Sequence, residues 1–509
     1  MNKSLKISVA LLFLFAVELS QVSAQNVAPV VKTDKGYIKG LTEDGIAVFK
    51  GVPYAAPPIG ALRFKPPVEH GIWKDTLSAQ KFGSVATQNS GKKVVGSEDC
   101  LSLNIYTPHI DHQKRAVLVW VHGGSMTAGA GKGQNGHAFT DKDDIVTITI
   151  NYRLGVFGFM YLGDADKSYA TSGNNGTLDC IMALSWIKRN IAAFGGDPDK
   201  VTIMGESAGA KLISAVLVSP KSKGLFQQYI AESGSVQCVR DSATAKNERL
   251  RVVHALGSGH YNVQALLKLP ADSLMKAQAI ACSGIGGNSF FGPVEDGVVI
   301  KGNPYTYAAG KSMSRIKALI GTNKVEAALF MAGDDQLQHP DTTILKSLFG
   351  DNYPMVYKAY QHELKTHAPY DAAVKVLTQY MYQLHSYRFA KMLTQNNIPV
   401  WMYRLNYDKA SNLGAAHAME LQYVWNDPQL ASATDPVKRQ LAANMHQAWV
   451  AFIKTGNPNG GTLPQWPGYK NDTRQIMSYD STSKAIGLKE VYDDKDFPSA
   501  VFVLKGKVR

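Results

Sequence analysis

Cysteine is scarce in this sequence, with four residues in a chain of 509. Their positions have no zinc-ligand spacing, and four are too few for the disulfide framework that stabilises small secreted domains. An oxidising compartment would allow one bridge, and we expect it between Cys238 and Cys282. The cysteine pattern therefore excludes a zinc module, and we expect no metal ion and no cofactor.

Long apolar runs are also scarce. After the signal-like N-terminus, no segment has the roughly 20 uninterrupted apolar residues that a membrane-spanning helix needs. The N-terminus itself has Lys3 and Lys6, the apolar run "ISVALLFLFAV" and small residues ending at Ala24, which is the pattern of a secretory signal peptide. We therefore expect a signal peptide over residues 1–24, a secreted or periplasmic protein, and one soluble domain over residues 25–509.

Concentrated positive charge is absent too. The formal net charge is +13, and it falls to +12 once Lys3, Lys6 and Glu18 leave with the signal peptide. The lysines and arginines form no long blocks and accompany no nucleic-acid motif, so they indicate a solvated surface and no nucleic-acid partner. Internal repeats, low-complexity tracts and linkers are also missing, which favours one domain with long insertions.

What the chain does contain is a series of strand-like apolar runs with helical patterns between them. The runs are "AVLVWVHGG" from Ala116, "IVTITINYR" from Ile145, "VTIMGES" from Val201, "YIAESGS" from Tyr229 and "IKALIGT" from Ile316. Continuous β-branched runs fit strands that are buried on both faces, and "TLDCIMALSWIKRNIAAFGG" has the apolar spacing of a helix. We therefore predict an α/β fold with a mostly parallel central sheet and helices on both faces.

The segment "FGGDPDKVTIMGESAGAKL" places Ser207 between Gly205 and Gly209. Because the chain has 45 glycines, a G-x-S-x-G match arises by chance in roughly one such chain in five, so the match alone is weak. Here, however, a strand-like run precedes the serine and a helix-like run follows it. Such a sharp turn lifts the hydroxyl to the top of the sheet and needs glycine on both sides. The context therefore predicts that Ser207 is a nucleophile.

A serine hydroxyl is a poor nucleophile at neutral pH, so it needs a base, and the base needs a carboxylate that orients it. On this type of sheet the expected chain order is serine, acid, histidine. Glu326 follows a strand-like run in "LIGTNKVEAALF", and His417 lies in the glycine-started loop "GAAHAMEL". The order predicts a catalytic triad of Ser207, Glu326 and His417.

Acyl transfer also needs backbone amides that bind the oxyanion. The segment "VWVHGGSM" ends a strand-like run and offers the amides of Gly124 and Ser125. The amide of Ala208 directly follows the serine, at the start of the helix-like run. We expect these three amides to form the oxyanion hole.

Ordered motifs along nearly all of the mature chain resemble the type B carboxylesterase family, which includes cholinesterases and bacterial p-nitrobenzyl esterases. The motifs are "FKGVPYAAPPIGALRF", "SEDCLSLNIYTP", "HGGS", "NYRLGVFGF", "GNNGTLD", "FGGDPDKVTIMGESAGA", "ESGS", "HAMELQYVW" and "KTGNPN". The resemblance implies an α/β-hydrolase fold, the same triad and oxyanion residues, and a small-molecule ester as substrate. It also implies two structural ion pairs, Arg63 with Glu98 and Arg153 with Asp179, and a buried carboxylate at Glu206.

The chain departs from the family pattern near the expected site. Ser125 stands where the family has glycine or alanine, and Met126 stands where it has an aromatic residue, so the pocket wall differs. Ala327 follows the acid where the family has glycine. Ala86 stands where the family has a cysteine, which leaves Cys100 without its usual partner.

The expected substrate follows from a missing aromatic residue. Cholinesterases hold the quaternary ammonium against a tryptophan in the loop before the "SEDC" motif, because an aromatic face attracts a cation. The corresponding stretch here, "TQNSGKKVVGSEDC", has no aromatic residue and carries Lys92 and Lys93. We expect the enzyme to prefer neutral esters with short or medium acyl chains over choline esters.

Two alternative functions remain open at the level of the sequence. Ser-x-x-Lys matches at residues 273–276 and 481–484, with Lys-Thr-Gly at 454–456, suggest a penicillin-recognising serine hydrolase, but the last motif ends a helical pattern. The fold also serves in non-catalytic binding modules that lost the nucleophile, whereas here no member of the triad is missing. The G-x-G-x-x-G match at 131–136 follows no strand and is expected to be a loop.

Overall fold

The computed structural model describes residues 28–257, 262–285, 287–305, 316–461 and 463–488. The expected signal peptide at residues 1–24 lies outside the described residues, and its cleavage stays a prediction. In the described part of the chain, no helix has both the length and the apolar character required to cross a membrane.

The fold is built on an eleven-stranded sheet with the order β16-β15-β14-β13-β12-β11-β9-β10-β8-β4-β3. The seven strands from β15 to β10 in this order are parallel to their neighbours, and antiparallel strands extend the sheet at both edges. The mostly parallel sheet of the α/β-hydrolase fold is therefore confirmed. Its strands are β3 (Leu41–Glu43), β4 (Ile46–Pro53), β8 (Ser102–Thr107), β9 (Arg115–Val121), β10 (Val146–Ile150), β11 (Gly196–Glu206), β12 (Gln228–Glu232), β13 (Lys317–Asn323), β14 (Val400–Leu405), β15 (Gln475–Tyr479) and β16 (Lys484–Gly487).

Two small sheets lie outside the central one. The first has the order β1-β2-β5, and the second is the hairpin β6-β7. Their bounds are β1 (Val30–Thr33), β2 (Gly36–Lys39), β5 (Leu77–Ser78), β6 (Gln88–Ser90) and β7 (Lys93–Val95).

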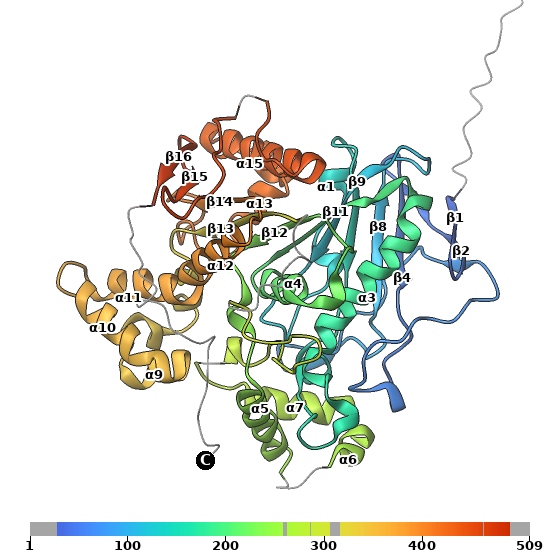
Figure 1. Cartoon of the computed structure of the whole chain (residues 1–509), viewed down its shortest axis with the longest axis horizontal. Helices are drawn as coiled ribbons and strands as arrows, with labels where there is room; N and C mark the ends of the chain where they lie inside the picture. The colour runs from blue at the N-terminus through green and yellow to red at the C-terminus, as the bar shows by residue number, and fades with distance from the viewer. Residues whose placement is uncertain (1–27, 258–261, 286, 306–315, 462, 489–509) are drawn as a thin grey trace, which may run out of the picture.

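Helices connect the strands and cover the sheet. The α-helices are α1 (His137–Thr140), α2 (Gly155–Phe159), α3 (Asn175–Asn190), α4 (Ala208–Val218), α5 (Ser242–Ala255), α6 (Val263–Lys268), α7 (Ala271–Ala281), α8 (Ala328–Met331), α9 (Thr342–Phe349), α10 (Tyr353–Glu363), α11 (Pro369–Thr378), α12 (Leu384–Gln395), α13 (Leu421–Val424), α14 (Pro428–Ala431) and α15 (Pro436–Thr455). In Figure 1, α3 and α4 lie in front of the strands, and α9 to α11 form a group at one side.

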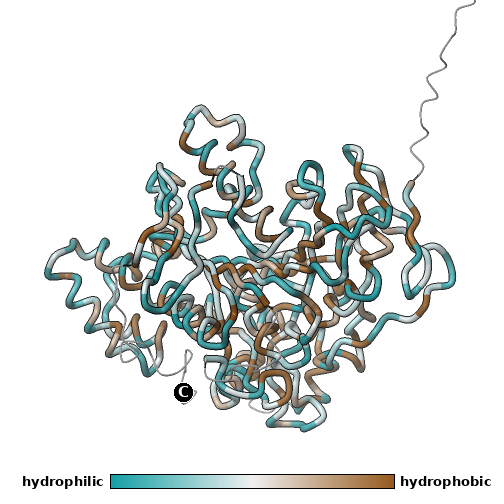
Figure 2. The backbone as a smooth tube through the Cα atoms, turned by 45° about the horizontal axis from the view of Figure 1, so that its top comes forward, coloured by the Kyte–Doolittle hydropathy of each residue, from teal (hydrophilic) through white to brown (hydrophobic). Residues whose placement is uncertain are grey.

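Both faces of the sheet are covered, as the β9 residues show. Val117 and Val119 belong to the apolar cluster that includes residues of α3 and α4. The intervening residues Leu118 and Trp120 belong to a second cluster that includes residues of α15. Because successive side chains of a strand point to opposite faces, a fully buried strand needs a run that is apolar at nearly every position. Many apolar segments accordingly gather in the middle of the molecule (Figure 2).

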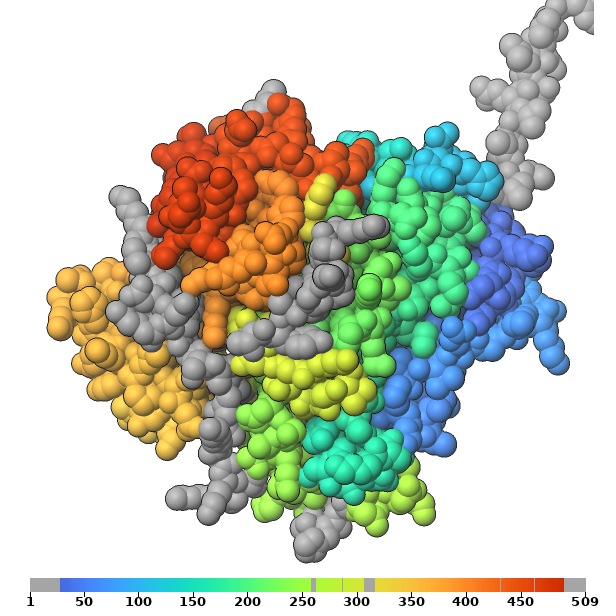
Figure 3. Space-filling view, viewed as in Figure 1, coloured from blue at the N-terminus to red at the C-terminus, as the bar shows by residue number. Residues whose placement is uncertain are grey.

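The connection from β13 to β14 contains a long insertion. Helices α9, α10 and α11 have an apolar cluster of their own, which includes Leu345, Val356 and Leu377. In the space-filling view these helices form a lobe at the edge of the molecule (Figure 3). The structure therefore has one of the predicted long insertions between β13 and β14.

The two ion pairs that the resemblance implied are present. Arg63 Nη2 lies 2.5 Å from Glu98 Oε1, and Arg153 Nη2 lies 2.7 Å from Asp179 Oδ1. Arg153 also donates from Nε to Asp179 Oδ2 at 2.9 Å, and both side chains of this pair are buried. The second pair joins the segment after β10 to α3 and therefore fixes a helix against the sheet.

The expected disulfide between Cys238 and Cys282 is not formed, and all four cysteines are free. Both thiols serve instead as small apolar groups, since Cys238 belongs to the large core cluster and Cys282 packs against it. Burial raises the pKa of Cys238 to about 11 and that of Cys282 to about 12. Cys100 is buried and unbridged, consistent with the missing partner at Ala86.

Candidate active site

Ser207 occupies the turn between β11 and α4, and its backbone has a positive φ of 52° with ψ −120°. The two flanking glycines are required by close packing. A Cβ atom on Gly209 would lie 2.0 Å from the Val121 carbonyl oxygen, and one on Gly205 would lie 2.7 Å from the Gly209 carbonyl carbon. This geometry confirms the predicted strand-to-helix turn and explains the glycines at both sides of the serine.

The three expected triad residues meet at this turn. His417 Nε2 lies 2.7 Å from Ser207 Oγ, and His417 Nδ1 lies 2.7 Å from Glu326 Oε2. Glu326 comes from the loop after β13, and His417 from the loop before α13. Residues separated by 210 positions thus form one continuous hydrogen-bonded chain, with the orientation that a serine, a base and an acid require.

The carboxylate of Glu326 is fully buried and is held by two further donors. Ser233 Oγ donates to Glu326 Oε1 at 2.6 Å, and the Asn323 amide donates to the same oxygen at 2.7 Å. An acceptor that receives three hydrogen bonds is suited to carry a negative charge opposite an imidazolium. Sequence reasoning assigned no role to Ser233, although the "ESGS" motif contains it.

Two aromatic rings flank His417. The ring centroids of Tyr382 and His417 are 4.6 Å apart, and those of Phe330 and His417 are 5.1 Å apart. Tyr382 lies in a π-helical turn, Gln379–Gln383, between α11 and α12, and such turns often occur at functional sites. Burial raises the pKa of the Tyr382 hydroxyl well above its ordinary value. The rings restrict the imidazole and shield it from water, which sequence patterns did not predict.

The loop after β9 brings the expected amide donors to the serine. Gly124 has φ 101° and Ser125 has φ 56°, so the backbone turns sharply at both residues. Within the described residues, the amides of Gly124, Ser125 and Ala208 donate no hydrogen bond to the protein. They are therefore available for a substrate oxygen.

His122 holds this loop in place and takes no part in the triad. Its ring stacks on Tyr152 at 4.5 Å, and the Tyr152 hydroxyl donates to the His122 carbonyl at 2.9 Å. Burial lowers the pKa of His122 to about 4, so the imidazole is neutral in the folded protein.

Three more glutamates, Glu206, Glu232 and Glu420, are buried near the triad. Burial raises the pKa of Glu206 and of Glu232 well above the ordinary value, and the neighbouring carboxylates raise it further. The same causes raise the pKa of Glu420 to about 8. Glu206 Oε1 lies 3.2 Å from His417 Nε2, and the raised pKa favours the neutral form of this carboxyl beside the imidazole.

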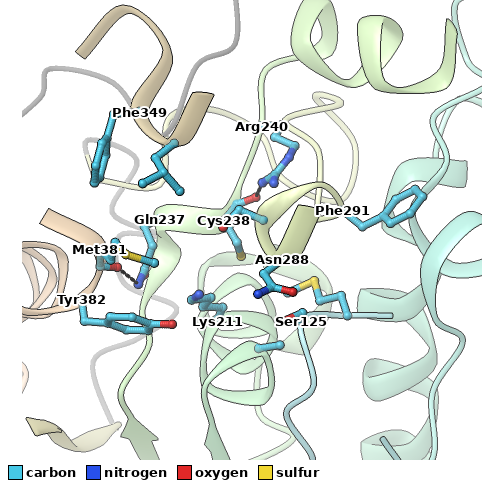
Figure 4. A pocket seen from close by; sticks show the side chains of 14 residues that line it. Ser125, Lys211, Gln237, Cys238, Arg240, Asn288, Phe291, Phe349, Met381 and Tyr382 are labelled. Carbon is cyan, nitrogen blue, oxygen red and sulfur yellow. Dashed lines mark hydrogen bonds between the residues drawn. The ribbon is translucent and has the colours of Figure 1, made fainter. Parts of the chain in front are cut away.

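A cavity opens beside the oxyanion loop, with about 590 Å³ of empty space when the open solvent at its mouth is included. Side chains from α4, the segment after β12, α9 and the π-helical turn face it (Figure 4). Its lining consists of Ser125, Met126, Ala208, Lys211, Gln237, Cys238, Arg240, Asn288, Ser289, Phe291, Leu348, Phe349, Met381 and Tyr382. Two of the three expected oxyanion donors thus lie at the wall of one cavity.

Lys92 and Lys93 were expected near the place where a choline ester would approach. They are exposed in the β6-β7 hairpin and do not line this cavity. Its positive charges come instead from Lys211 and Arg240, which sequence reasoning did not single out. Lys211 lies in α4, the helix that follows Ser207, whereas Arg240 reaches the cavity from the segment after β12.

The competing motifs do not form sites in the structure. Lys454-Thr455 ends α15, and Gly456 caps that helix with φ 71°. Residues 273–276 lie within α7, and 131–136 form a loop with one short 3-10 turn. In the described ranges, no group of three or more His, Cys, Asp or Glu side chains is arranged to hold a metal ion.

Known proteins are similar to this chain over most of its length. The sequence model of the carboxylesterase family matches residues 27–496. The para-nitrobenzyl esterase of Bacillus subtilis is 35% identical over 477 residues, which cover 89% of this chain and 95% of that protein. The phenmedipham hydrolase of Pseudarthrobacter oxydans is 31% identical, with 88% and 94% covered. The solved structure of a Geobacillus stearothermophilus carboxylesterase at pH 6.2 matches with a TM-score of 0.81 and 35% identity, over 90% of this chain and 97% of that one.

Proposed function

This chain belongs to the carboxylesterase family and is a carboxylic ester hydrolase, and from that premise we propose that Ser207 is the residue that its substrates acylate. The observation that supports this assignment is the hydrogen-bonded chain Ser207–His417–Glu326, with 2.7 Å at both contacts of the imidazole. Gly124, Ser125 and Ala208 supply the oxyanion hole.

Each step of the reaction then has a residue that performs it. His417 Nε2 accepts the Ser207 proton as Oγ attacks the ester carbonyl, and the three amides bind the negative oxygen of the tetrahedral intermediate. The imidazolium faces the Glu326 carboxylate, and it donates its proton to the leaving alcohol. A water molecule then attacks the acyl-serine by the same route, with His417 again as the base.

The substrates that we propose are esters with short to medium acyl chains and without a quaternary ammonium. The cavity is small, and among its described lining residues are two cations and no carboxylate. Phe291, Phe349 and Tyr382 offer aromatic faces, but Lys211 repels a second positive charge at the same place. Arg240 is paired with Glu248 and contributes less to this repulsion. Acetylthiocholine should therefore have a lower kcat/KM than a neutral acetate ester under matched conditions, and equal use of both would contradict the proposal.

Ser207→Ala tests the nucleophile. We expect kcat for p-nitrophenyl acetate to fall by several orders of magnitude, up to about 10⁶-fold, because the acyl-enzyme route is lost. Ser185→Ala is the matched control, since this serine lies on α3 and donates to the Ile181 carbonyl at 2.8 Å, away from the triad. Labelling by a fluorophosphonate should disappear in the first variant only. Unlabelled wild-type protein would favour the non-catalytic binding module.

We further propose that residues 1–24 direct export, on the basis of the charged start, the apolar run and the small residues before Gln25. The mass of the protein recovered from the native host should correspond to a chain that begins at Gln25. A mass that includes the first 24 residues would contradict the proposal.

A further inference from the structure

Lys211 lies one helical turn after Ser207 in α4, and its side chain lines the cavity beside the oxyanion loop. Its backbone amide donates to the Ser207 carbonyl at 2.9 Å, which fixes the base of the side chain relative to the nucleophile. In Figure 4 the Lys211 side chain lies between Tyr382 on one side and Asn288 on the other, below Cys238. A positive charge therefore stands close to the ester that Ser207 attacks.

Among the described residues, no carboxylate forms an ion pair with Lys211. Its ammonium lies instead 4.9 Å from the ring centroid of Tyr382, in a cation–π contact. Arg240, the other cation in the lining, is already paired, because its Nε donates to Glu248 Oε1 at 2.6 Å and its guanidinium donates to the Cys238 carbonyl. Lys211 is thus the cation in this cavity that a ligand can neutralise.

The surroundings of Lys211 make that charge costly in the absence of a ligand. Burial lowers the pKa of Lys211, because an ammonium that leaves water without an ionic partner loses solvation. A carboxylate that enters the cavity restores a partner to the ammonium, whereas a neutral group of the same shape does not. The carboxylate should therefore bind with a more favourable free energy than the neutral group.

We propose that Lys211 is a specificity-determining residue that binds an ionised carboxylate of the substrate. The esterase then prefers esters that carry a second, free carboxylate over their neutral analogues. Asn288 and Ser289, which line the same cavity, add neutral hydrogen-bond donors to this subsite. The inference rests on the proposed function, since it needs an ester bound at Ser207, and it explains by one charge why a cation is rejected and an anion is favoured.

The reach of the subsite limits the substrates. Four residues along a helix correspond to a rise of about 6 Å, so the test esters carry their carboxylate within a few bonds of the ester carbonyl. It can belong to the acyl group or to the alcohol, and matched pairs distinguish these two cases. Monomethyl glutarate and its neutral amide, methyl glutaramate, test the acyl side. Acetoxyacetate and acetoxyacetamide test the alcohol side.

The experiment measures kcat/KM for both pairs by pH-stat titration. A hydrogen bond to a charged group supports a preference of about tenfold or more, so we expect one pair to show the carboxylate ester ahead of its amide by that factor. In Lys211→Met this ratio should fall to near one, and in Lys211→Arg most of it should remain. Lys221→Met removes an exposed charge near the end of α4 and should leave the ratio unchanged.

The outcomes separate the inference from the proposed function. A wild-type ratio of one or less for both pairs would overturn the subsite, and so would a ratio that Lys211→Met does not change. Loss of all ester hydrolysis in Ser207→Ala tests the nucleophile independently, because it affects the carboxylate and amide esters alike. The pair that shows the preference assigns the subsite to the acyl or the alcohol side.

Discussion

Ser233→Ala tests how firmly the acid of the triad must be held. Glu326 accepts hydrogen bonds from Ser233 Oγ at 2.6 Å, from the Asn323 amide at 2.7 Å and from His417 Nδ1 at 2.7 Å. The substitution removes the first of these without a change in backbone requirement, since alanine differs from serine only by the hydroxyl. A hydrogen bond to a charged group contributes about 1.5–3 kcal/mol, and both side chains are fully buried, so water cannot readily replace the donor.

That free energy acts mainly when the carboxylate faces an imidazolium, which is in the transition state. We therefore expect kcat to fall by about 10- to 100-fold, with a smaller change in KM. Glu326→Gln should cost more, about 10⁴-fold, because it removes the charge itself. These rates should be measured with p-nitrophenyl acetate, together with thermal unfolding of each variant.

The matched control for this prediction is Ser235→Ala, a buried serine two positions away that donates to Gln237 Oε1 at 2.8 Å. Its loss should affect stability but not the rate of the folded enzyme. If Ser233→Ala keeps kcat within twofold of wild type, the positioning role is refuted. A rise in KM alone would equally contradict a role that acts through Glu326.

Three further predictions concern the scaffold. Gly209→Ala should abolish activity and lower the melting temperature, because the added methyl group would lie 2.0 Å from a backbone oxygen of β9; a variant with wild-type activity would refute the close packing. Burial lowers the pKa of His122 to about 4, below the unfolded value of about 6.5, so the unfolded chain binds more protons between these values and the free energy of unfolding should fall by up to about 3 kcal/mol as pH drops through this window. In His122→Phe, the free energy of unfolding measured by urea titration should fall less over the same pH window. An equal pH dependence in the variant and the wild type would contradict this role of His122. Arg153→Ala leaves Asp179 buried and unpaired and should cost about 3–5 kcal/mol, whereas Lys188→Ala breaks an exposed pair and should cost less than about 1 kcal/mol; similar losses in both would be inconsistent with the burial of the first pair.

The elements that the sequence predicted well are those whose signal is local. The run around Val201 became β11, and the pattern that closes on Gly456 became α15, because apolar periodicity depends only on neighbouring residues. Ser207 was recognisable for the same reason, from its flanking glycines together with the strand-like run before it and the helix-like run after it. Glu326 and His417 required the additional rule of chain order, since nothing near either residue distinguishes it from an ordinary loop acid or histidine.

Other features depend on which distant segments become neighbours. Ser233 reaches Glu326 because β12 pairs with β13, so the two strands end side by side although their residues are 93 positions apart. The expected bridge from Cys238 to Cys282 failed for the converse reason, since spacing along the chain does not report which side chains face each other. Strand order and the packing of helices decide both outcomes.

The catalytic residues and the walls of the cavity come from different parts of the chain. Ser207 follows β11 and Glu326 follows β13, two parallel strands on either side of β12 in the central sheet. Leu348, Phe349 and Met381, in contrast, reach the cavity from the insertion between β13 and β14. Lys211 has the appearance of a solvated helix residue in the sequence, but in the fold it is partly buried, and the insertion supplies Tyr382, whose ring centroid lies 4.9 Å from the ammonium. Substitutions in the insertion can therefore change which esters are accepted while the hydrogen bonds of the triad remain. Because the two sets of residues are separate, the sequence predicted the type of reaction but not the choice of substrate.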